Sequence, residues 1–251
     1  MGLSRASPLW GDRGAGIDRM RIDILTLFPE IFEPVLCESI TGRARKAGLV
    51  EWHTHDIRNH AANKHNKVDD RPFGGGPGMV MMCQPLWDCV AAVEAMDAAP
   101  ATRVLLTPQG VPLTQRLVED LAAKPRLLMI AGHYEGIDER VIERLGPMEI
   151  SIGDYVLSGG ELPAMVLVDA VTRLIPGVLG HEASAAEDSF SGLVTPTGVK
   201  RLLDCPHYTR PREWEGMEVP DILTSGDHEK VAGWRLEQKL ARTRARRPDL
   251  L

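Results

Sequence analysis

Short apolar runs and longer segments with helical spacing alternate along the first two thirds of the chain. The apolar runs predict strands at residues 21–28, 50–57, 103–107, 126–131 and 148–152. The helical spacing predicts helices at residues 29–47, 85–97, 113–123, 137–145 and 161–174. Strands that alternate with helices are typical of a parallel sheet covered on both faces, so the pattern predicts an α/β fold.

Three segments show neither strand nor helix spacing, and a final helix follows the last of them. Residues 58–78 show no periodicity, and a loop of that length is usually functional or disordered. Residues 176–200 are rich in Gly, Ser, Thr and Pro, which predicts a linker. Residues 204–220 are irregular, and residues 227–246 predict a basic amphipathic helix. The expected organisation is an extension at 1–19, an α/β domain at 20–178, a flexible interdomain linker at 179–202 and a small helical domain at 203–251.

Composition places the chain among ordinary globular proteins. It has 251 residues, of which 43% are hydrophobic and 25% charged, close to the averages for such proteins. No apolar run approaches the ~20 residues of a membrane helix, so no membrane association is expected. The four cysteines form no C-x-x-C pair, which favours reduced thiols in the cytoplasm. Residues 1–19 lack the apolar core of a signal peptide, and we expect a dispensable extension before Met20.

Charge is distributed unevenly along a chain whose net charge is −6. Residues 41–71 hold seven Lys and Arg against four Asp and Glu, and residues 230–247 hold seven against one. Two basic segments in an otherwise acidic chain suit the binding of a polyanion at defined places. The alternative is a mobile polar loop for the first segment and a solvated helix face for the second.

Several common catalytic motifs are absent. The chain has no G-x-x-x-x-G-K-[ST] motif, no G-x-G-x-x-G between a strand and a helix, and no H-E-x-x-H helix. These absences argue against Walker-type nucleotide hydrolysis, an ordinary dinucleotide site and a zinc-protease site. His53 and His55 share one face of a predicted strand, but no third metal ligand is near in sequence, so we expect surface histidines.

Three glycine-containing loops follow predicted strands, at residues 107–110, 131–136 and 151–161. Ligands of open parallel sheets bind at the carboxyl ends of the strands. Glycine allows a ligand to approach the backbone, and tyrosine offers a flat apolar face. The loops together favour a site for a flat heterocyclic ligand, although each alone is equally typical of a turn. Ser158 and Glu161 also fit a capping box for the following helix.

Two further segments have both a functional and a structural interpretation. Residues 69–79, D-D-R-P-F-G-G-G-P-G-M, fit a hinge or a lid that closes over substrate. Residues 181–190 bring carboxylates into the predicted linker, where they are either solvated or able to serve as a general base. Arg173 ends a predicted helix, where a cation complements the helix dipole.

Longer strings carry a resemblance to a known family. They are LFPEIF at 27–32, VDDRPFGGGPGMVM at 68–81, GHYEGIDERV at 132–141, SIGDYVLSGGELPAM at 151–165, RLIPGVLGHEASAAEDSF at 173–190 and LDCPHYTRPREWEGMEVPDILTSGDH at 203–228. From Met20 onward the sequence resembles the bacterial tRNA (guanine-N1)-methyltransferases, the TrmD family of the SPOUT class. The resemblance implies a parallel-sheet SPOUT domain with a deep trefoil knot, plus a small helical C-terminal domain.

The resemblance also implies a cofactor site. S-adenosylmethionine is expected to sit bent in the knot. The residues expected to hold it are Gly132, Tyr134, Glu135, Ile152, Gly153, Asp154, Tyr155, Val156 and Leu157, with Pro108, Gly110, Gly159 and Gly160 nearby. Family members also depend on Mg²⁺, for which the chain shows no clean ligand set, although Glu135 is a candidate.

The implied substrate is the guanosine immediately 3′ of the anticodon in tRNA, whose methylation maintains the reading frame. The resemblance assigns Asp188 as the base that removes the N1 proton and Arg173 as the cation that stabilises charge on O6. It implies a homodimer in which the partner's linker and C-terminal domain complete each site. The anticodon stem-loop is expected to contact the 69–79 loop and the basic C-terminal helix, with Trp214 and Trp234 either stacking on bases or packing in a core.

Three other functions remain open at this point. A related knotted methyltransferase that acts on ribosomal RNA is the nearest, and the DDRPFGGGPG and HYTRP strings favour the tRNA enzyme over it. A non-catalytic RNA-binding protein of the same fold is disfavoured by the presence of Arg173 and Asp188. A small-molecule methyltransferase is disfavoured by the two basic segments.

Overall fold

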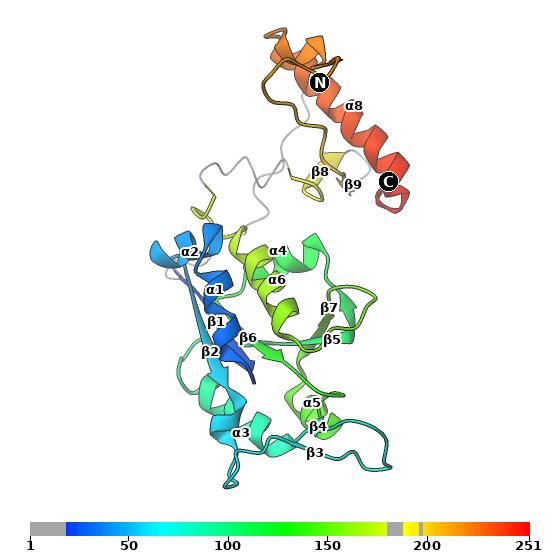
Figure 1. Ribbon diagram of the computed structural model, residues 1–251. Coiled ribbons are helices and arrows are strands. Elements are labelled where there is room, and N and C mark those ends of the chain that lie inside the picture. Colours follow the sequence, from blue (N-terminus) through cyan, green and yellow to red (C-terminus); the bar gives the residue numbers. More distant parts are fainter. Residues whose placement is uncertain (1–18, 180–187, 196–197) are drawn as a thin grey trace. The chain divides into compact units, whose positions relative to one another are not determined.

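The structure is a computed structural model that describes residues 19–179, 188–195 and 198–251 (Figure 1). These residues divide between two compact units, one that ends at residue 179 and one that begins at residue 188. The first unit is an α/β domain, and the second is built around one long helix. No helix in the described parts of the chain is long and apolar enough to cross a membrane.

A five-stranded sheet forms the centre of the first unit. The strands are β1 (Met20–Thr26), β2 (Val50–Asp56), β5 (Thr102–Pro112), β6 (Arg126–Ala131) and β7 (Met148–Ser151). Their order is β2-β1-β6-β5-β7, and every neighbouring pair is parallel. The predicted parallel sheet is therefore confirmed, and its strands end at one common edge.

Helices cover both faces of this sheet (Figure 1). They are α1 (Glu33–Leu36), α2 (Ser39–Lys46), α3 (Cys83–Glu94), α4 (Gln115–Ala122), α5 (Glu139–Leu145) and α6 (Glu161–Thr172). Side chains alternate along β6: Leu127 and Met129 pack with α1, α2, α4 and α6, whereas Leu128 and Ile130 pack with α3 and α5. All six residues of β6 are buried, as expected for a central strand covered on both faces.

Two predicted elements of the first unit differ in detail from the structure. The single helix expected at residues 29–47 is divided into a 3-10 turn η1 (Pro29–Ile31), α1 and α2. The break between α1 and α2 falls at Cys37 and Glu38, where Glu38 has an extended backbone, and Ser39 follows it with a left-handed φ of 50° that a continuous helix does not allow. The segment expected to lack structure at 58–78 contains the end of η2 (Ile57–His60) and the strand β3 (Asp69–Asp70), which pairs with β4 (Val80–Met81).

The second unit combines short strands with one long helix. Its strands are β8 (Gly192–Thr195), β9 (Gly198–Arg201), β10 (Glu213–Trp214) and β11 (Met217–Glu218), and its helices are η3 (Asp221–Thr224), α8 (His228–Arg246) and η4 (Pro248–Leu250). The basic helix is confirmed, and the Asp227 side chain caps it by accepting from the Lys230 N–H. The antiparallel pair β8–β9 lies in a segment where no strand was predicted.

Residues 202–205, between β9 and β10, are held against α8 by a backbone hydrogen bond and by an ion pair. The Leu203 N–H donates to Thr243 Oγ1 at 2.9 Å, and that hydroxyl in turn donates to the Lys239 carbonyl at 2.7 Å. The Lys239 ammonium lies 3.1 Å from the Asp204 carboxylate. Leu202 and Cys205 are buried beside these contacts, so the long helix organises the unit.

Candidate active site

A pocket of about 320 Å³ opens at the carboxyl ends of β5, β6 and β7. The three segments singled out in the sequence line it, but only those at residues 132–136 and 152–160 are loops. Residues 107–109, expected in a loop after a strand, lie inside β5, where its register against β7 shifts between Leu106 and Val111. Its volume lies at the lower end of the range for small-molecule sites. Eleven of the thirteen expected cofactor residues line it: Pro108, Gly132, Tyr134, Glu135, Ile152, Gly153, Tyr155, Val156, Leu157, Gly159 and Gly160.

Glycines allow these two loops to lie against each other. The Gly160 N–H donates to the Gly132 carbonyl at 2.8 Å. A Cβ at Gly160 would lie 2.7 Å from Ala131 Cα, and a Cβ at Gly159 would lie 2.5 Å from the His133 ring. Real side chains do not tolerate such distances. The S-G-G sequence is thus required for the loop before α6 to reach the end of β6.

The remaining two expected cofactor residues, Gly110 and Asp154, are not among the lining residues. A Cβ at Gly110 would collide with the backbone of Glu149 and Ile150, so this glycine allows β5 to pack on β7. Asp154 is exposed on the loop that follows β7. Their assignment to the cofactor stays a prediction.

Exposed apolar side chains surround the opening of the pocket. Val156 is 84% exposed, and Tyr134, Tyr155 and Leu157 are also exposed. Tyr134 has a φ of 65°, which is uncommon for a residue with a side chain and is typical of functional sites. Apolar side chains held in solvent beside a pocket favour a ligand with an apolar face.

The pocket also contains a histidine that sequence reasoning did not single out. His133 lies between Gly132 and Tyr134, and its only sequence signal is this position in the loop. The capping box expected from Ser158 and Glu161 is wrong, because α6 begins after Gly160 with no side-chain cap. The Glu161 carboxylate instead accepts from the Thr26 hydroxyl at 2.8 Å.

The two expected catalytic residues lie in different units. Arg173 is half-buried immediately after α6, where its N–H donates to the Asp169 carbonyl, as expected for a residue that ends a helix. Asp188 is exposed in the second unit, where its carbonyl accepts from the Ser191 hydroxyl at 2.7 Å. Arg173 is not among the lining residues of the pocket. Their catalytic roles stay predictions.

A buried network of charges extends from the middle of β1 to the amino end of β6. Asp23 is fully buried on β1 and accepts from Arg21, His55 and Arg126 at 2.9 to 3.0 Å. Burial opposes ionisation, but these hydrogen bonds outweigh it and hold the pKa of the Asp23 carboxyl well below its usual value. His55 was expected at the surface, and this is wrong, because it pairs with the buried carboxylate.

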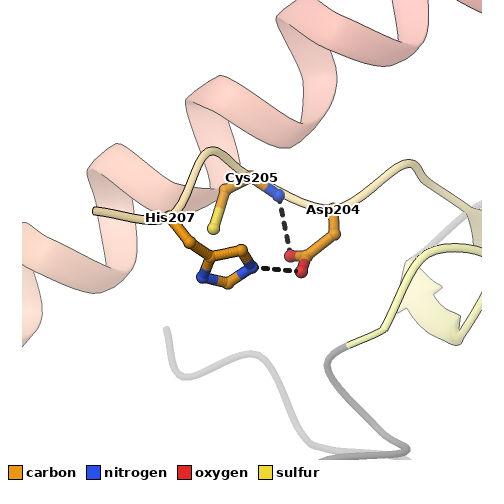
Figure 2. Close-up of side chains that lie close together, drawn as sticks. All are labelled: Asp204, Cys205 and His207. Carbon is orange, nitrogen blue, oxygen red and sulfur yellow. Dashed lines mark hydrogen bonds and ion pairs between the residues drawn. The ribbon is translucent and has the colours of Figure 1, made fainter. Parts of the chain in front are cut away.

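One group of three metal-ligating side chains occurs within the described residues, and it lies in the second unit. Asp204, Cys205 and His207 place ligand atoms within 4.8 Å of one another (Figure 2). The carboxylate is already bonded to His207 at 2.7 Å and to Lys239 at 3.1 Å. Burial opposes the shift, but these partners lower the pKa of Asp204 to about 2. The nearby ammonium makes the cluster an internal ion pair rather than a cation site.

Candidate RNA-contacting side chains are exposed in each unit. Phe73 in the glycine-rich loop is 99% exposed, and Arg71 beside it is also exposed. In the second unit, α8 exposes Arg235, Arg244 and Arg246. Trp214 is exposed, so a core role for it is wrong, whereas Trp234 is half-buried with its ring 6.5 Å from that of Tyr208.

Comparisons with known proteins agree with this geometry. The family described as tRNA (Guanine-1)-methyltransferase TrmD matches residues 20–251. A protein of Rhodopirellula baltica is 54% identical over 233 residues, which is 92% of this chain and 94% of the relative. A protein of Chloroflexus aurantiacus is 55% identical, over 92% of this chain and 88% of the relative. A protein of Shewanella putrefaciens is 53% identical, over 92% of this chain and 90% of the relative. All three relatives are named tRNA (guanine-N(1)-)-methyltransferase.

Proposed function

The chain belongs to the tRNA (guanine-1)-methyltransferase family, and from this premise we propose that it transfers a methyl group from S-adenosylmethionine to N1 of a guanosine in tRNA. The proposal is supported above all by one observation. Most of the residues that the family resemblance assigns to the cofactor line a single pocket at the carboxyl ends of the parallel strands.

The pocket has the features that S-adenosylmethionine requires. Gly159 and Gly160 allow the loop before α6 to lie against the end of β6 and so shape the pocket, and the exposed Tyr134 and Tyr155 offer flat apolar faces beside it. When bound, the cofactor supplies an electrophilic methyl group on a positively charged sulfur. The loops on either side of the pocket hold the ligand in one orientation, which reduces the entropy cost of the reaction. We also propose that the chain around the pocket forms a trefoil knot.

Asp188 and Arg173 have complementary roles in the proposed chemistry. Guanine N1 carries a weakly acidic proton and is a poor nucleophile until that proton is removed. We assign its removal to the Asp188 carboxylate. Negative charge then grows on O6, and we assign its stabilisation to the Arg173 guanidinium.

We propose that the target is the guanosine immediately 3′ of the anticodon, and that its methylation in the cytoplasm maintains the reading frame. The anticodon loop presents unpaired bases, which proteins commonly bind by stacking aromatic side chains on them. Phe73 is available for such stacking in the first unit, and the basic face of α8 is available for phosphates in the second.

A homodimer with shared active sites is part of the proposal. The exposed faces of α1 and α6, which pack side by side, carry Val35, Leu162 and Val166, and Ile31 precedes them on η1. Apolar side chains at these neighbouring positions favour a second copy of the chain as the partner that covers them. Light scattering of the purified protein tests this directly, with a dimer as the expected mass.

The residues around the pocket do not fit a resident Mg²⁺ ion. Mg²⁺ prefers oxygen ligands in octahedral geometry. Glu135, Glu139 and Glu149 line the pocket, but among the residues that the structure describes they form no group of three whose ligand atoms converge on one point. We therefore assign no step of the reaction to the metal.

The proposal is tested by methyl transfer from labelled S-adenosylmethionine to two unmodified tRNA transcripts, one with guanosine and one with adenosine after the anticodon. Transfer to the first alone is expected. Transfer to neither, with cofactor binding intact, would indicate a ribosomal RNA substrate or a non-catalytic protein.

An Asp188→Ala variant tests the assigned base. It should lose at least about 100-fold in turnover, as expected for a lost general base, and bind S-adenosylmethionine as the wild type does. Asp221→Ala, which removes an exposed carboxylate on η3, is the matched control and should retain turnover. Unchanged turnover in Asp188→Ala would remove this residue from the mechanism.

A further inference from the structure

Glu161 is the one pocket-side carboxylate in the described first unit that is buried, with 4% of its surface exposed. It is the first residue of α6, where the helix dipole favours a negative charge. A buried charge is costly unless it has partners. The partners of Glu161 come from parts of the chain that are far apart in sequence.

The first partner lies at the end of β1. The Thr26 hydroxyl, which is fully buried, donates to Glu161 Oε1 at 2.8 Å. The same hydroxyl oxygen accepts from the Phe28 N–H at 2.9 Å. The carboxylate therefore fixes the direction in which the chain leaves β1.

The second partner lies in the loop after β6. Glu161 Oε2 is 3.6 Å from His133 Nε2, and Gly159 lies directly against both groups. The His133 ring packs on Phe28, with centroids 4.9 Å apart, and on Tyr134 at 5.8 Å. The His133 backbone pairs with Gly159 in a short antiparallel bridge. The position of Tyr134 at the pocket therefore depends on His133, which pairs with Glu161.

We propose that Glu161 is a positioning residue for the methyl-donor site, which acts through His133 and Thr26 to hold the loops at the ends of β1 and β6 against the loop that precedes α6. The carboxylate does not line the pocket itself. Its loss allows the 132–136 and 152–160 loops to separate, and the pocket loses its shape for S-adenosylmethionine. This inference rests on the proposed function, since the pocket is taken to be the cofactor site.

The test compares cofactor affinity in a small set of variants, measured by calorimetry at a temperature where circular dichroism shows each to be folded. Glu161→Gln keeps the size of the side chain but removes its charge. It should raise the Kd for S-adenosylmethionine by about 10-fold or more. The KM for the cofactor should rise in parallel, whereas the KM for tRNA should change by less than about twofold.

Two substitutions of His133 distinguish loss of the ion pair with Glu161 from a general loss of packing around the pocket. His133→Ala should weaken cofactor binding as Glu161→Gln does. His133→Arg should restore it to within about threefold of the wild type, because a guanidinium can form an ion pair with the carboxylate. If Glu161→Gln does not fold, the two His133 variants test the inference together with Thr26→Val, which removes the hydroxyl that donates to Glu161 and accepts from the Phe28 N–H.

Asp23→Asn is the matched control, since it removes a buried carboxylate of the same sheet that does not line the pocket. It should lower thermal stability and leave the Kd of the folded protein unchanged. The inference is overturned if Glu161→Gln binds the cofactor with wild-type Kd, or if His133→Arg binds as weakly as His133→Ala. Failure of the wild type itself to bind S-adenosylmethionine would instead overturn the proposed function.

Discussion

The two ends of the parallel sheet differ in what their side chains do: one holds a buried ion-pair network and the other an open pocket. Toward the amino end of the sheet, Asp23 in the middle of β1 and Arg126 at the start of β6 are both buried, and Arg126 also donates to four backbone carbonyls around the end of α3. At the carboxyl ends, glycines, exposed tyrosines and an open pocket replace this network. The Asp23 and Arg126 side chains are satisfied by other groups of the protein, whereas the carboxyl end, apart from the Glu161–Thr26 pair, leaves backbone and apolar surface available to a ligand.

The difference shows where stability and binding reside in this fold. A buried ion pair contributes little net stability but is strongly destabilising when one partner is removed. Pocket residues such as Val156 are exposed and contribute little to folding. Substitutions at the two ends should therefore have different effects. Those toward the amino end change the free energy of unfolding, and those at the carboxyl end change cofactor affinity.

The largest effect is expected at the amino end. Arg126→Met should lower the free energy of unfolding by about 3–5 kcal/mol. Asp23 would lose its most deeply buried partner and keep only Arg21 and His55, and four backbone carbonyls would lose their donor. Urea denaturation measures this, and calorimetry should give an unchanged Kd for S-adenosylmethionine in the folded protein. Arg103→Met removes a half-buried pair with Glu94 and should cost less. A cofactor affinity that falls with Arg126→Met would contradict the separation of the two ends.

A smaller effect is expected at the carboxyl end. Gly160→Ala places a Cβ 2.7 Å from Ala131 Cα, so the two loops must separate. Cofactor affinity should fall by about 100-fold, or ~2.7 kcal/mol, as measured by calorimetry. The control is Gly233→Ala in α8, where no atom lies within 4 Å of the added group. If Gly160→Ala binds the cofactor normally, the close approach of the loops is not what shapes the pocket.

The smallest effect is expected in the pH dependence of stability, to which the ionised Asp23 carboxylate contributes. Its pKa is lower in the folded chain, so the unfolded chain binds more protons and stability is lost as the pH falls. The free energy of unfolding should begin to decline near the unfolded pKa, at about pH 4, and continue to fall below it. Urea titrations at several pH values should show a shallower decline for Asp23→Asn. Equal slopes would mean that another group controls acid stability.

The sheet and most helices follow from the sequence because hydrophobic spacing is local information. The single helix expected at 29–47 was wrong because the backbone leaves helical geometry at Glu38, which is extended, and at Ser39, which has a left-handed φ. The β8–β9 hairpin was missed because its short strands are embedded in a Gly- and Thr-rich segment.

The site was predictable as three segments of the chain, but not in its internal contacts. Glu161 fits a local capping box in sequence, whereas its partner Thr26 lies 135 residues away. Asp23 and Arg126 are similarly remote, at a separation of 103 residues. Such pairs depend on the order of strands in the sheet, which spacing along the chain does not specify.

Hydrogen–deuterium exchange with and without S-adenosylmethionine tests most directly whether the carboxyl end of the sheet is the cofactor site. The account predicts slower exchange in residues 132–136 and 152–160 when the cofactor is bound, with residues 97–103 at the amino end unchanged. Protection confined to the amino end, or none in the two loops despite saturating cofactor, would contradict it.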